Sequence, residues 1–452
     1  MSTQRSSFTG KIGFVLAAAG SAVGLGNIWR FPYLAAKYGG GIFLLVYVLL
    51  SVTFGFALMA AEIALGRKTQ LSAIGAFRAL DRRFAFIGPL ASIVPVLILP
   101  YYSVIGGWVI KYTVGFATGE ASAMAQSNYF GNHIGRTWEP ILWFFLFILM
   151  TTLIVFFGVE KGIEKVSKLM MPILVILTIG IAIYTIVTLD GAWAGVIYYI
   201  KPDFSHFSLM TIVSAMGQLF YSMSLAMGIM ITFGSYMKKE INIETSIHQI
   251  EFFDMGIAFL AGLMIIPAVF AFSGGDESAL GQGPGLMFST LPKIFDTMPG
   301  GAVLGTAFFI MVFFAALTSA ISLMETVVSI FMDKLKWNRR PCCLLALAIS
   351  LLLGLPSSLG YSAWSEVKVL GMQFLDLFDF VSNSVLMPIV AFCTCLFVGF
   401  FLSPCAIEEE IELSGRFRGK RLFSVMIRYI APLCILLILL SSVLNAFGVI
   451  KI

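Results

Sequence analysis

Eleven long apolar segments, separated by short polar stretches, dominate the sequence. A helix needs about 20 apolar residues to cross a bilayer. The whole chain is 59% hydrophobic and only 12% charged, whereas soluble domains carry about 25% charged residues. The sequence therefore predicts an all-α membrane protein with eleven transmembrane helices, at about residues 12–36, 42–68, 85–118, 140–158, 168–188, 208–237, 250–273, 301–333, 341–355, 370–402 and 424–449.

The connections between these segments are short, so residues 1–452 are expected to form a single polytopic domain. The first apolar run leads into a glycine-rich stretch and not into a small-residue cleavage site, so it is expected to stay in the mature protein. Six cysteines lie in or beside apolar runs without a metal or disulfide pattern and are expected to be free.

Lys and Arg residues are distributed unevenly between the two sides of the predicted bundle. Twenty-one fall in segments on the side of the N-terminus and five on the other side. By the positive-inside rule, the N-terminus is expected in the cytoplasm and the C-terminus outside, with the protein multi-pass in a plasma membrane, for a bacterium the inner membrane. The net charge of +5 reflects this asymmetry and indicates no nucleic-acid partner; the lipid bilayer is the expected surrounding.

A glycine-rich, polar stretch, Gly20–Tyr33, interrupts the first apolar segment. Unpaired backbone groups at membrane depth are costly, so such a break persists only where protein, water or a solute satisfies them. The carbonyls that end the first half-helix suit a cation, and the N–H groups that begin the second suit a carboxylate. The break therefore predicts a site for an ion beside a small zwitterion.

Small and hydroxyl residues interrupt the sixth segment in the same way, at Ser222–Gly228. Alone, this signal is weaker, because Ser and Gly also serve helix packing in membranes. However, spans one and six are five apart, and matching breaks in two halves are what an inverted repeat predicts. We expect a 5+5 inverted repeat with discontinuous helices 1 and 6: repeat one at about 12–188, repeat two at about 208–402, and an extra helix at about 424–449.

Five separated motifs, in order, carry a family resemblance. They are Gly24–Pro32, Tyr101-Tyr102 with Trp108, Gln218–Tyr236, Leu317–Ser319 and Asp379-Phe380. Together the chain resembles the neurotransmitter:sodium symporter family, in its bacterial eleven-span branch of leucine and multi-hydrophobic amino-acid transporters. The resemblance implies sodium-coupled amino-acid import by alternating access, with spans one, two, six and seven rocking against the rest.

The resemblance also implies two sodium sites. The first would use the Ala22 carbonyl with Asn27, Ser222 and Asp254, together with the substrate carboxylate, which would couple the two loads. The second would use carbonyls of Gly20, Val23 and Ala315 with the hydroxyls of Thr318 and Ser319. Taken alone, Ser222 could be a packing residue, and Thr318-Ser319 could be hydrogen bonded to its own helical turn.

Asp254 departs from the asparagine often found here in the family. An intramembrane carboxylate is costly and usually functional, and in this chain it could supply the fixed negative charge that chloride supplies in some relatives. We therefore expect transport without a chloride requirement.

For the substrate, the resemblance implies that the amides of Leu25 and Gly26 and the hydroxyl of Tyr102 hold the carboxylate. The carbonyls of Ala22 and Tyr221, with Ser224, would hold the amino group, although Tyr102 alone could equally be a packing residue. The side-chain pocket would be formed by Ile98, Tyr221, Met223, Met227, Ser319 and Leu323, beside Ser222. Because methionine is flexible, Met227, in place of the usual phenylalanine, favours a bulky hydrophobic or aromatic amino acid.

Charged residues near span ends match the gates of the family. Arg30 and Asp379 would close the outer side, and Arg5 with Asp333 would form the cytoplasmic latch. Individually, such charges are usually interfacial. Gly162 and Pro172 have a spacing similar to one that lets the fifth span unwind in bacterial relatives, although an ordinary helix start explains them as well.

The sequence also bears on classes of function other than a carrier. An intramembrane enzyme is not expected, because the three histidines lie in loops and show no HExxH-type spacing. A sodium-dependent solute sensor or channel-like protein stays possible, because the same sites could bind without concentrative transport. A monomer would suffice for transport, and an oligomer is also possible.

Overall fold

The computed structural model describes residues 7–274 and 283–446, and these residues are almost entirely helical, with two isolated β-bridges and no strand. The first half contains α1 (Lys11–Ala22), η1 (Gly26–Arg30), α2 (Phe31–Lys37), α3 (Gly41–Leu50), α4 (Phe56–Thr69), α5 (Ala73–Leu80), α6 (Ile87–Ala117), α7 (Ala121–Met124), α8 (Tyr129–Ile134), α9 (Trp138–Phe156), η4 (Val159–Glu164), α10 (Lys165–Thr188) and α11 (Ala192–Ile200). The second half contains α12 (Leu209–Ser222), α13 (Ile229–Gly234), α14 (Ile243–Ser273), η7 (Leu286–Thr290), α15 (Leu291–Thr297), α16 (Gly301–Leu335), α17 (Arg339–Leu359), α18 (Phe374–Asp379), η8 (Phe380–Leu386), α19 (Met387–Leu396), η9 (Phe397–Phe401), α20 (Pro404–Glu412), α21 (Lys420–Val425), η10 (Met426–Ile430) and α22 (Ala431–Ala446).

Among the described residues, nine helical stretches are long and apolar enough to cross a membrane. A tenth span is the pair Lys11–Ala22 and Gly26–Lys37, which is bent by 54° at its break. The shorter apolar helix α12, continued by α13 after a non-helical segment, supplies the remaining predicted span. The fold class expected from the sequence, with helices 1 and 6 discontinuous, is therefore confirmed.

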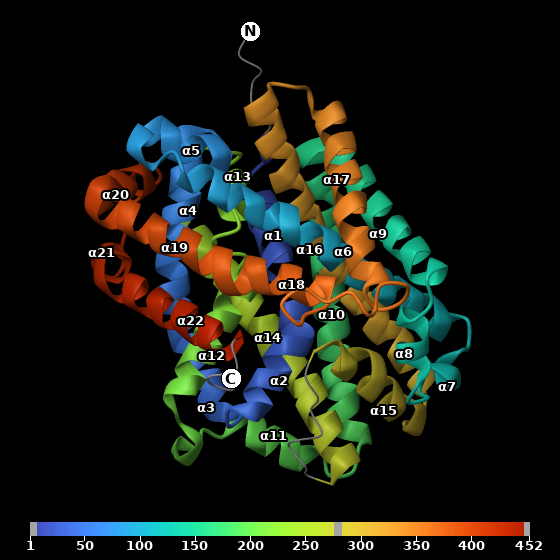
Figure 1. Cartoon of the computed structure of the whole chain (residues 1–452). Coiled ribbons are helices and arrows are strands. Elements are labelled where there is room, and N and C mark those ends of the chain that lie inside the picture. Colours follow the sequence, from blue (N-terminus) through green and yellow to red (C-terminus); the bar gives the residue numbers. More distant parts are fainter. Residues whose placement is uncertain (1–6, 275–282, 447–452) are drawn as a thin grey trace.

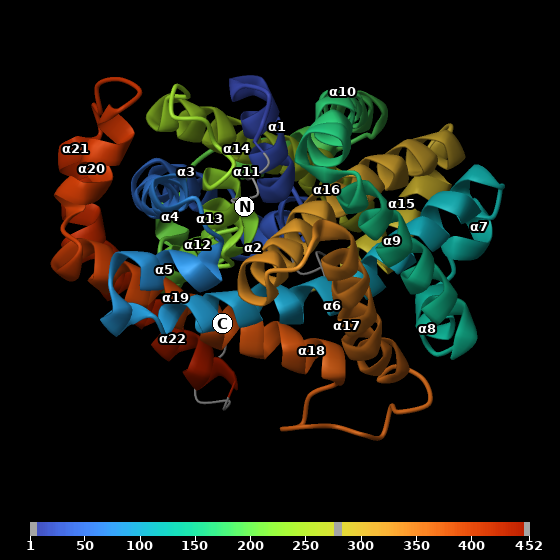
Figure 2. The same ribbon diagram turned by 90° about the horizontal axis from the view of Figure 1, so that it is seen from above.

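The broken helices lie in the interior of the bundle. Figures 1 and 2 show α1 and α13 beside α14 and α16, with α20, α21 and α22 at one edge and α7, α8 and α9 at the opposite edge. The breaks of α1–α2 and α12–α13 are thus placed within the protein, where their polar backbone groups can find partners other than lipid.

Helices α4 and α13 approach each other closely because glycines lie where they cross. An ideal Cβ built on Gly66 would lie 1.9 Å from the carbonyl oxygen of Ile231, and one built on Gly234 would lie 2.3 Å from that of Ile63. Small residues that allow close backbone approach are a common device of membrane helix packing. The two helices are therefore interlocked at backbone level.

Three predicted spans begin earlier than expected. The helix of the fifth span starts at Val159 and not at 168, the seventh at Ile243, and the eleventh at Lys420. The first turns of these three helices contain polar residues, since a membrane helix can continue beyond the apolar core of the bilayer. Hydropathy alone therefore places the starts of these helices too late in the sequence.

Candidate functional site

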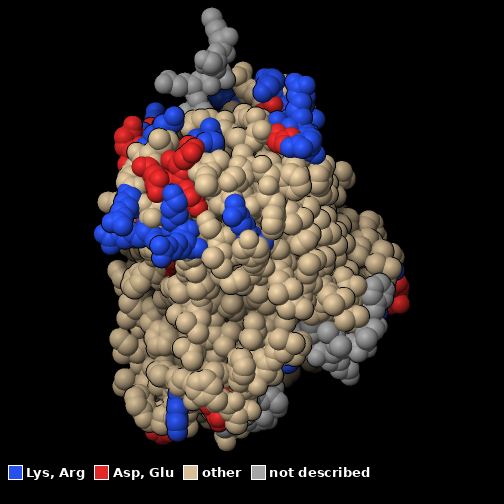
Figure 3. All heavy atoms as spheres, turned by 90° about the vertical axis from the view of Figure 1, so that its left-hand side faces the viewer, with Lys and Arg blue, Asp and Glu red and all other residues tan. Residues whose placement is uncertain are grey.

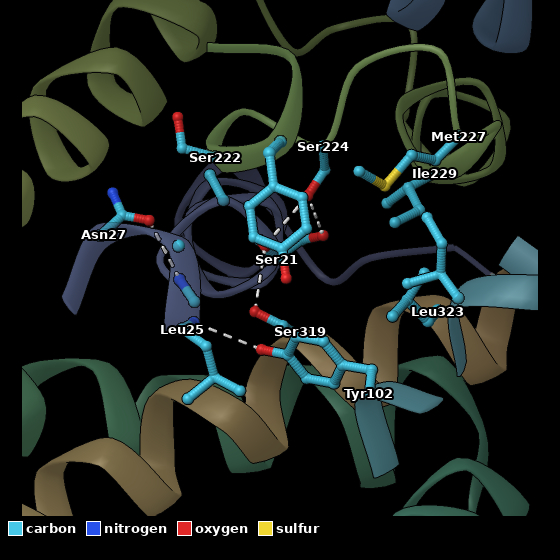
Figure 4. Close-up of a pocket in the computed structure, with 15 residues that line it drawn as sticks. Ser21, Leu25, Asn27, Tyr102, Ser222, Ser224, Met227, Ile229, Ser319 and Leu323 are labelled. Atoms are coloured by element: carbon cyan, nitrogen blue, oxygen red, sulfur yellow. Dashed lines mark hydrogen bonds between the residues drawn. The ribbon is translucent and has the colours of Figure 1, made fainter. Parts of the chain in front are cut away.

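A buried cavity lies between the two helix breaks. Figure 4 shows its side chains converging from α1 and η1, from the segment after α12, and from α6 and α16. The cavity is formed by Ser21, Ala22, Gly24, Leu25, Gly26, Asn27, Ile98, Tyr102, Tyr221, Ser222, Ser224, Met227, Ile229, Ser319 and Leu323. The structure therefore brings together eleven of the twelve residues predicted for the substrate, the exception being Met223.

Asp254 of α14 is fully buried and organises one wall of this region. Its Oδ1 accepts a hydrogen bond from Asn27 Nδ2 at 2.7 Å, and its Oδ2 accepts one from the Tyr47 hydroxyl at 2.8 Å. Ser222 Oγ lies 3.5 Å from Oδ2 and 2.8 Å from the Tyr47 hydroxyl. Three of the four residues predicted for the first sodium site are thus in contact, and Ala22 lines the adjoining cavity.

The donor set around Asp254 suits a hard cation. It consists of the Asp254 carboxylate and the hydroxyls of Tyr47 and Ser222, and such oxygen atoms are the ligands that alkali and alkaline-earth ions prefer. Asn27 turns its amide nitrogen toward Asp254, and its amide oxygen accepts from the Gly24 N–H at 3.3 Å. In the described part of the chain, no Lys or Arg forms an ion pair with this carboxylate. A buried carboxylate without a cationic side chain is expensive, so its chemistry favours a bound cation.

Ser319 of α16 faces the end of α1, where backbone carbonyls lack helical partners. Its hydroxyl lies 3.3 Å from the Gly20 oxygen, 3.2 Å from the Ser21 oxygen and 3.4 Å from the Val23 oxygen. The Gly20 and Val23 carbonyls and the Ser319 hydroxyl belong to the predicted second sodium site, and the Ser21 carbonyl lies beside them without having been predicted. Their convergence gives an oxygen-rich corner that a small cation could share.

Thr318 and Ala315 complete that predicted set on the same helix. The Thr318 hydroxyl donates to its own helix, to the Phe314 carbonyl at 2.9 Å and the Ala315 carbonyl at 3.2 Å. An ideal Cβ built on Gly20 would lie 3.2 Å from Thr318 Cβ, so α1 and α16 touch here. The Thr318 hydroxyl is thus hydrogen bonded to its own helical turn, which is the alternative stated for it above. The residue nevertheless lies next to the predicted ion site.

Backbone groups of the first break contact α6 and α12. The Leu25 N–H donates to the Tyr102 hydroxyl at 3.4 Å (Figure 4). Gln218 Nε2 donates to the Gly26 carbonyl at 3.0 Å, and an ideal Cβ on Gly26 would lie 2.4 Å from Tyr221 Cδ1. Glycine is therefore required where η1 passes beneath the tyrosine ring.

The apolar side of the cavity differs from the sequence prediction in one residue. Ile98, Met227 and Leu323 line it as expected, together with Ile229. Met223 does not, because Ser51 donates to its sulfur at 3.7 Å and that sulfur packs against Gly55 in the second span. Met223 therefore lies outside this cavity, and its role in the substrate pocket stays a prediction.

The cavity has a volume of about 30 Å³. This is room for at most a few water molecules, so a bulky side chain fits only if the lining moves. Met227 is well suited to move, because its unbranched side chain adapts to irregular space.

The second break is held open by the predicted residue Ser224 together with Ser21, Glu62 and Ala226, which were not among the predicted site residues. Ser224 and Ala226 have positive φ values of 53° and 59°, which are uncommon for non-glycine residues. The Ala226 N–H donates to Glu62 Oε1 at 2.7 Å, and Ser224 Oγ donates to the Ser21 carbonyl at 3.0 Å. Glu62 could have been suspected as a lone carboxylate in an apolar span, whereas nothing in the sequence singles out Ser21.

At the end of the bundle that is predicted to face outward, Arg30 and Asp379 line a second cavity of about 640 Å³. Asp379 accepts hydrogen bonds from the Tyr101 hydroxyl at 3.1 Å and from Asn383 at 2.6 Å, while Arg30 lies 5.5 Å from the Tyr221 ring centroid. In the described part of the chain, the two predicted gate residues do not form an ion pair. Arg30 and Asp379 line the same cavity but are not in contact with each other.

At the other end, Arg5 lies outside the described residues. Asp333 accepts hydrogen bonds from the backbone N–H and hydroxyl of Ser72, at 2.7 and 2.6 Å. The adjacent ion pair joins Glu325 to Arg339, and the Tyr236 hydroxyl donates to the same carboxylate at 2.7 Å. This ion pair, which was not predicted from the sequence, connects α16 and α17 at the same end of the bundle as Asp333.

Gly162 and Pro172 lie in a continuous helix. Gly162 belongs to the π-helical segment η4, and Pro172 lies inside α10. An ideal Cβ on Gly162 would lie 2.1 Å from the Ile154 carbonyl oxygen, so packing against α9 also requires this glycine. Unwinding of this span stays a prediction.

Comparison with known proteins adds independent information. The sequence profile described as the Sodium:neurotransmitter symporter family matches residues 5–133 and 125–448. An uncharacterized sodium-dependent transporter of Bacillus subtilis, YhdH, is 36% identical over 96% of this chain and 96% of its own length. A sodium- and chloride-dependent GABA transporter of Drosophila melanogaster is 27% identical over 90% of this chain and 48% of its own length.

The structural comparison agrees with the sequence comparison. The crystal structure of MhsT in complex with L-phenylalanine is similar with a TM-score of 0.88 and 37% identity, covering 97% of this chain and all of that one. Broken helices, a buried cavity between them and matches over nearly the whole length lead to one conclusion. This chain belongs to the sodium:neurotransmitter symporter family, whose members are membrane transporters coupled to sodium.

Proposed function

We propose that the protein is a symporter that uses the sodium gradient to import amino acids with bulky hydrophobic or aromatic side chains. The observation that carries this proposal is the meeting of two helix breaks at one cavity, with the Asp254 cluster on one side and apolar side chains on the other. MhsT, the structural relative, binds L-phenylalanine, which is a substrate of this class.

Two sodium ions would travel with each substrate. The first would bind beside Asp254, Asn27 and Ser222, next to the substrate carboxylate, and the second among the oxygens near Ser319. If the substrate carboxylate ligates the first sodium ion, substrate and sodium bind cooperatively, because the negative charge of the carboxylate and the positive charge of the ion stabilise each other. The work of transport then comes from differential binding in two conformations and not from covalent chemistry.

The permanent carboxylate of Asp254 supports transport that needs no chloride. The distribution of Lys and Arg supports a plasma-membrane protein with its N-terminus in the cytoplasm and its C-terminus outside. A monomer contains both helix breaks, so one chain would suffice for the transport cycle.

Reconstituted proteoliposomes test this function. With sodium outside, labelled L-phenylalanine should accumulate above its external concentration, and accumulation should collapse when sodium is equal on both sides. Replacing chloride by gluconate should leave uptake unchanged. Sodium-dependent binding without accumulation would instead indicate a sensor, and sodium-gradient-independent equilibration would indicate a channel.

A further inference from the structure

One arginine occupies an unusual place in the eleventh span. Residues Lys420–Leu444 form a candidate membrane helix, and Arg428 is the ninth residue of that stretch. At 1.5 Å per residue it lies about 12 Å along the helix from Lys420. Its neighbours Val425, Tyr429 and Leu433 are 48%, 62% and 61% exposed on the perimeter of the bundle. Arg428 therefore belongs to a face that contacts lipid.

Among the described residues, one hydrogen bond holds the Arg428 side chain. Arg428 Nε donates to the Gly399 carbonyl at 2.9 Å. Gly399 lies in η9, at the end of the tenth span, where carbonyls have no helical donor. An ideal Cβ on Gly399 would lie 3.3 Å from Arg428 Cα and Cγ, so the glycine lets the arginine stem pack against η9.

A role as a helix cap uses only part of the guanidinium group. Arginine carries five N–H donors, and one is used by Gly399. Within residues 7–274 and 283–446, the two terminal nitrogens have no other hydrogen-bond or ion-pair partner. A charge that is fixed in a span with unused donors is costly unless an anion reaches it.

Arg421 extends the basic site toward the end of the same helix. It is exposed and lies seven residues before Arg428, which places both on one face about 10 Å apart. Tyr429 and Phe400, with ring centroids 6.5 Å apart, form an aromatic surface beside them, and aromatic side chains are enriched at the headgroup level of membranes. In Figure 3 basic side chains gather toward this end of the molecule, whereas the middle is apolar.

We propose that Arg428, with Arg421, binds the phosphate of an anionic phospholipid in the leaflet at the basic end of the bundle. The planar guanidinium matches phosphate geometry, and Arg421 adds attraction closer to the surface. The lipid would join the ends of the tenth and eleventh spans, at η9 and η10. The proposal does not depend on which solute the protein transports.

Native mass spectrometry of the full-length protein in detergent tests this site. Phosphatidylglycerol should be retained in preference to phosphatidylcholine and should raise the Tm of the unmodified protein. Each basic residue near an anionic surface contributes about 1 kcal/mol, which corresponds to about fivefold in affinity. Arg428→Gln should therefore weaken phosphatidylglycerol binding at least about fivefold, and Arg428→Lys should weaken it less, because the charge is kept.

Arg416→Gln is the matched control, because Arg416 is a nearby exposed arginine off this helix face. It should bind phosphatidylglycerol as the unmodified protein does. Equal loss in the Arg416 variant would show a diffuse charge effect, and unchanged lipid retention in Arg428→Gln would overturn the site. An equal Tm increase with inorganic phosphate alone would show a free-anion site and would also overturn the lipid assignment.

Discussion

Replacing Asp254 by Asn tests the origin of sodium dependence. Asn keeps the size of the side chain and can still accept from Asn27, so the fold should be retained. A cation held by Asn27 and Ser222 would lie about 4 Å or less from the carboxylate charge, and at an effective permittivity of 20 that attraction is about 4 kcal/mol.

That energy sets an upper limit of about a thousandfold on the loss of sodium affinity. The Asn oxygen can still ligate a cation, so we expect the sodium concentration for half-maximal L-phenylalanine binding to rise about 10- to 1000-fold. Scintillation proximity binding over a sodium titration measures this. We also expect chloride to restore part of the affinity in the variant, because a mobile anion would replace the lost fixed charge.

Asp376→Asn is the control, because Asp376 is an exposed carboxylate of the outer cavity, on α18. It should change the sodium titration by less than about twofold, since an exposed charge is screened. If Asp254→Asn also left the sodium titration unchanged within about twofold while the protein stayed folded, the carboxylate would not be a determinant of sodium binding, and the reasoning would be wrong.

Three further predictions follow from packing and burial. Met227→Phe should reduce uptake of aromatic relative to small amino acids by about tenfold or more, because it fills the cavity, and competition uptake measures the change. Gly66→Ala should destabilise the protein by about 1–3 kcal/mol through a clash with the Ile231 carbonyl and so lower its Tm. Gly256→Ala, whose Cβ meets nothing within 4 Å, should not; equal stability of the two variants would contradict the packing argument. Burial lowers the pKa of His133 to about 4 from 6.5, so only the unfolded state gains a proton as pH falls from 6.5 to 4. Stability should therefore decrease over that range, by up to about 1.4 kcal/mol per pH unit, and His133→Gln should flatten the Tm profile.

The sequence predicted the spans and both breaks because these features are local. Apolar length marks a membrane helix, and a run such as Gly24-Leu-Gly26 inside one marks an interruption. The gathering of Asn27, Ser222 and Asp254 followed from the resemblance, since composition alone cannot place three distant segments together.

The contacts that support the site were not predictable in the same way. Tyr47 and Glu62 lie in the second span without a motif, and their partners come from the sixth and seventh spans. Met223 lies outside the cavity with its sulfur near Ser51, and the left-handed residues Ser224 and Ala226 redirect the chain after it. Such reversals depend on tertiary contacts such as the bond from Ala226 to Glu62.

The crossing of α4 and α13 constrains how the molecule can change shape. Two backbones in such close contact cannot slide along each other without collision, and Glu62 also ties α4 to the segment before α13. Any opening toward the side predicted to be cytoplasmic would therefore move α4 and α13 together as one rigid body, and the hinge would have to lie in other segments. The half-helix α13 would then gain its stiffness from a neighbour, although it is itself only six residues long.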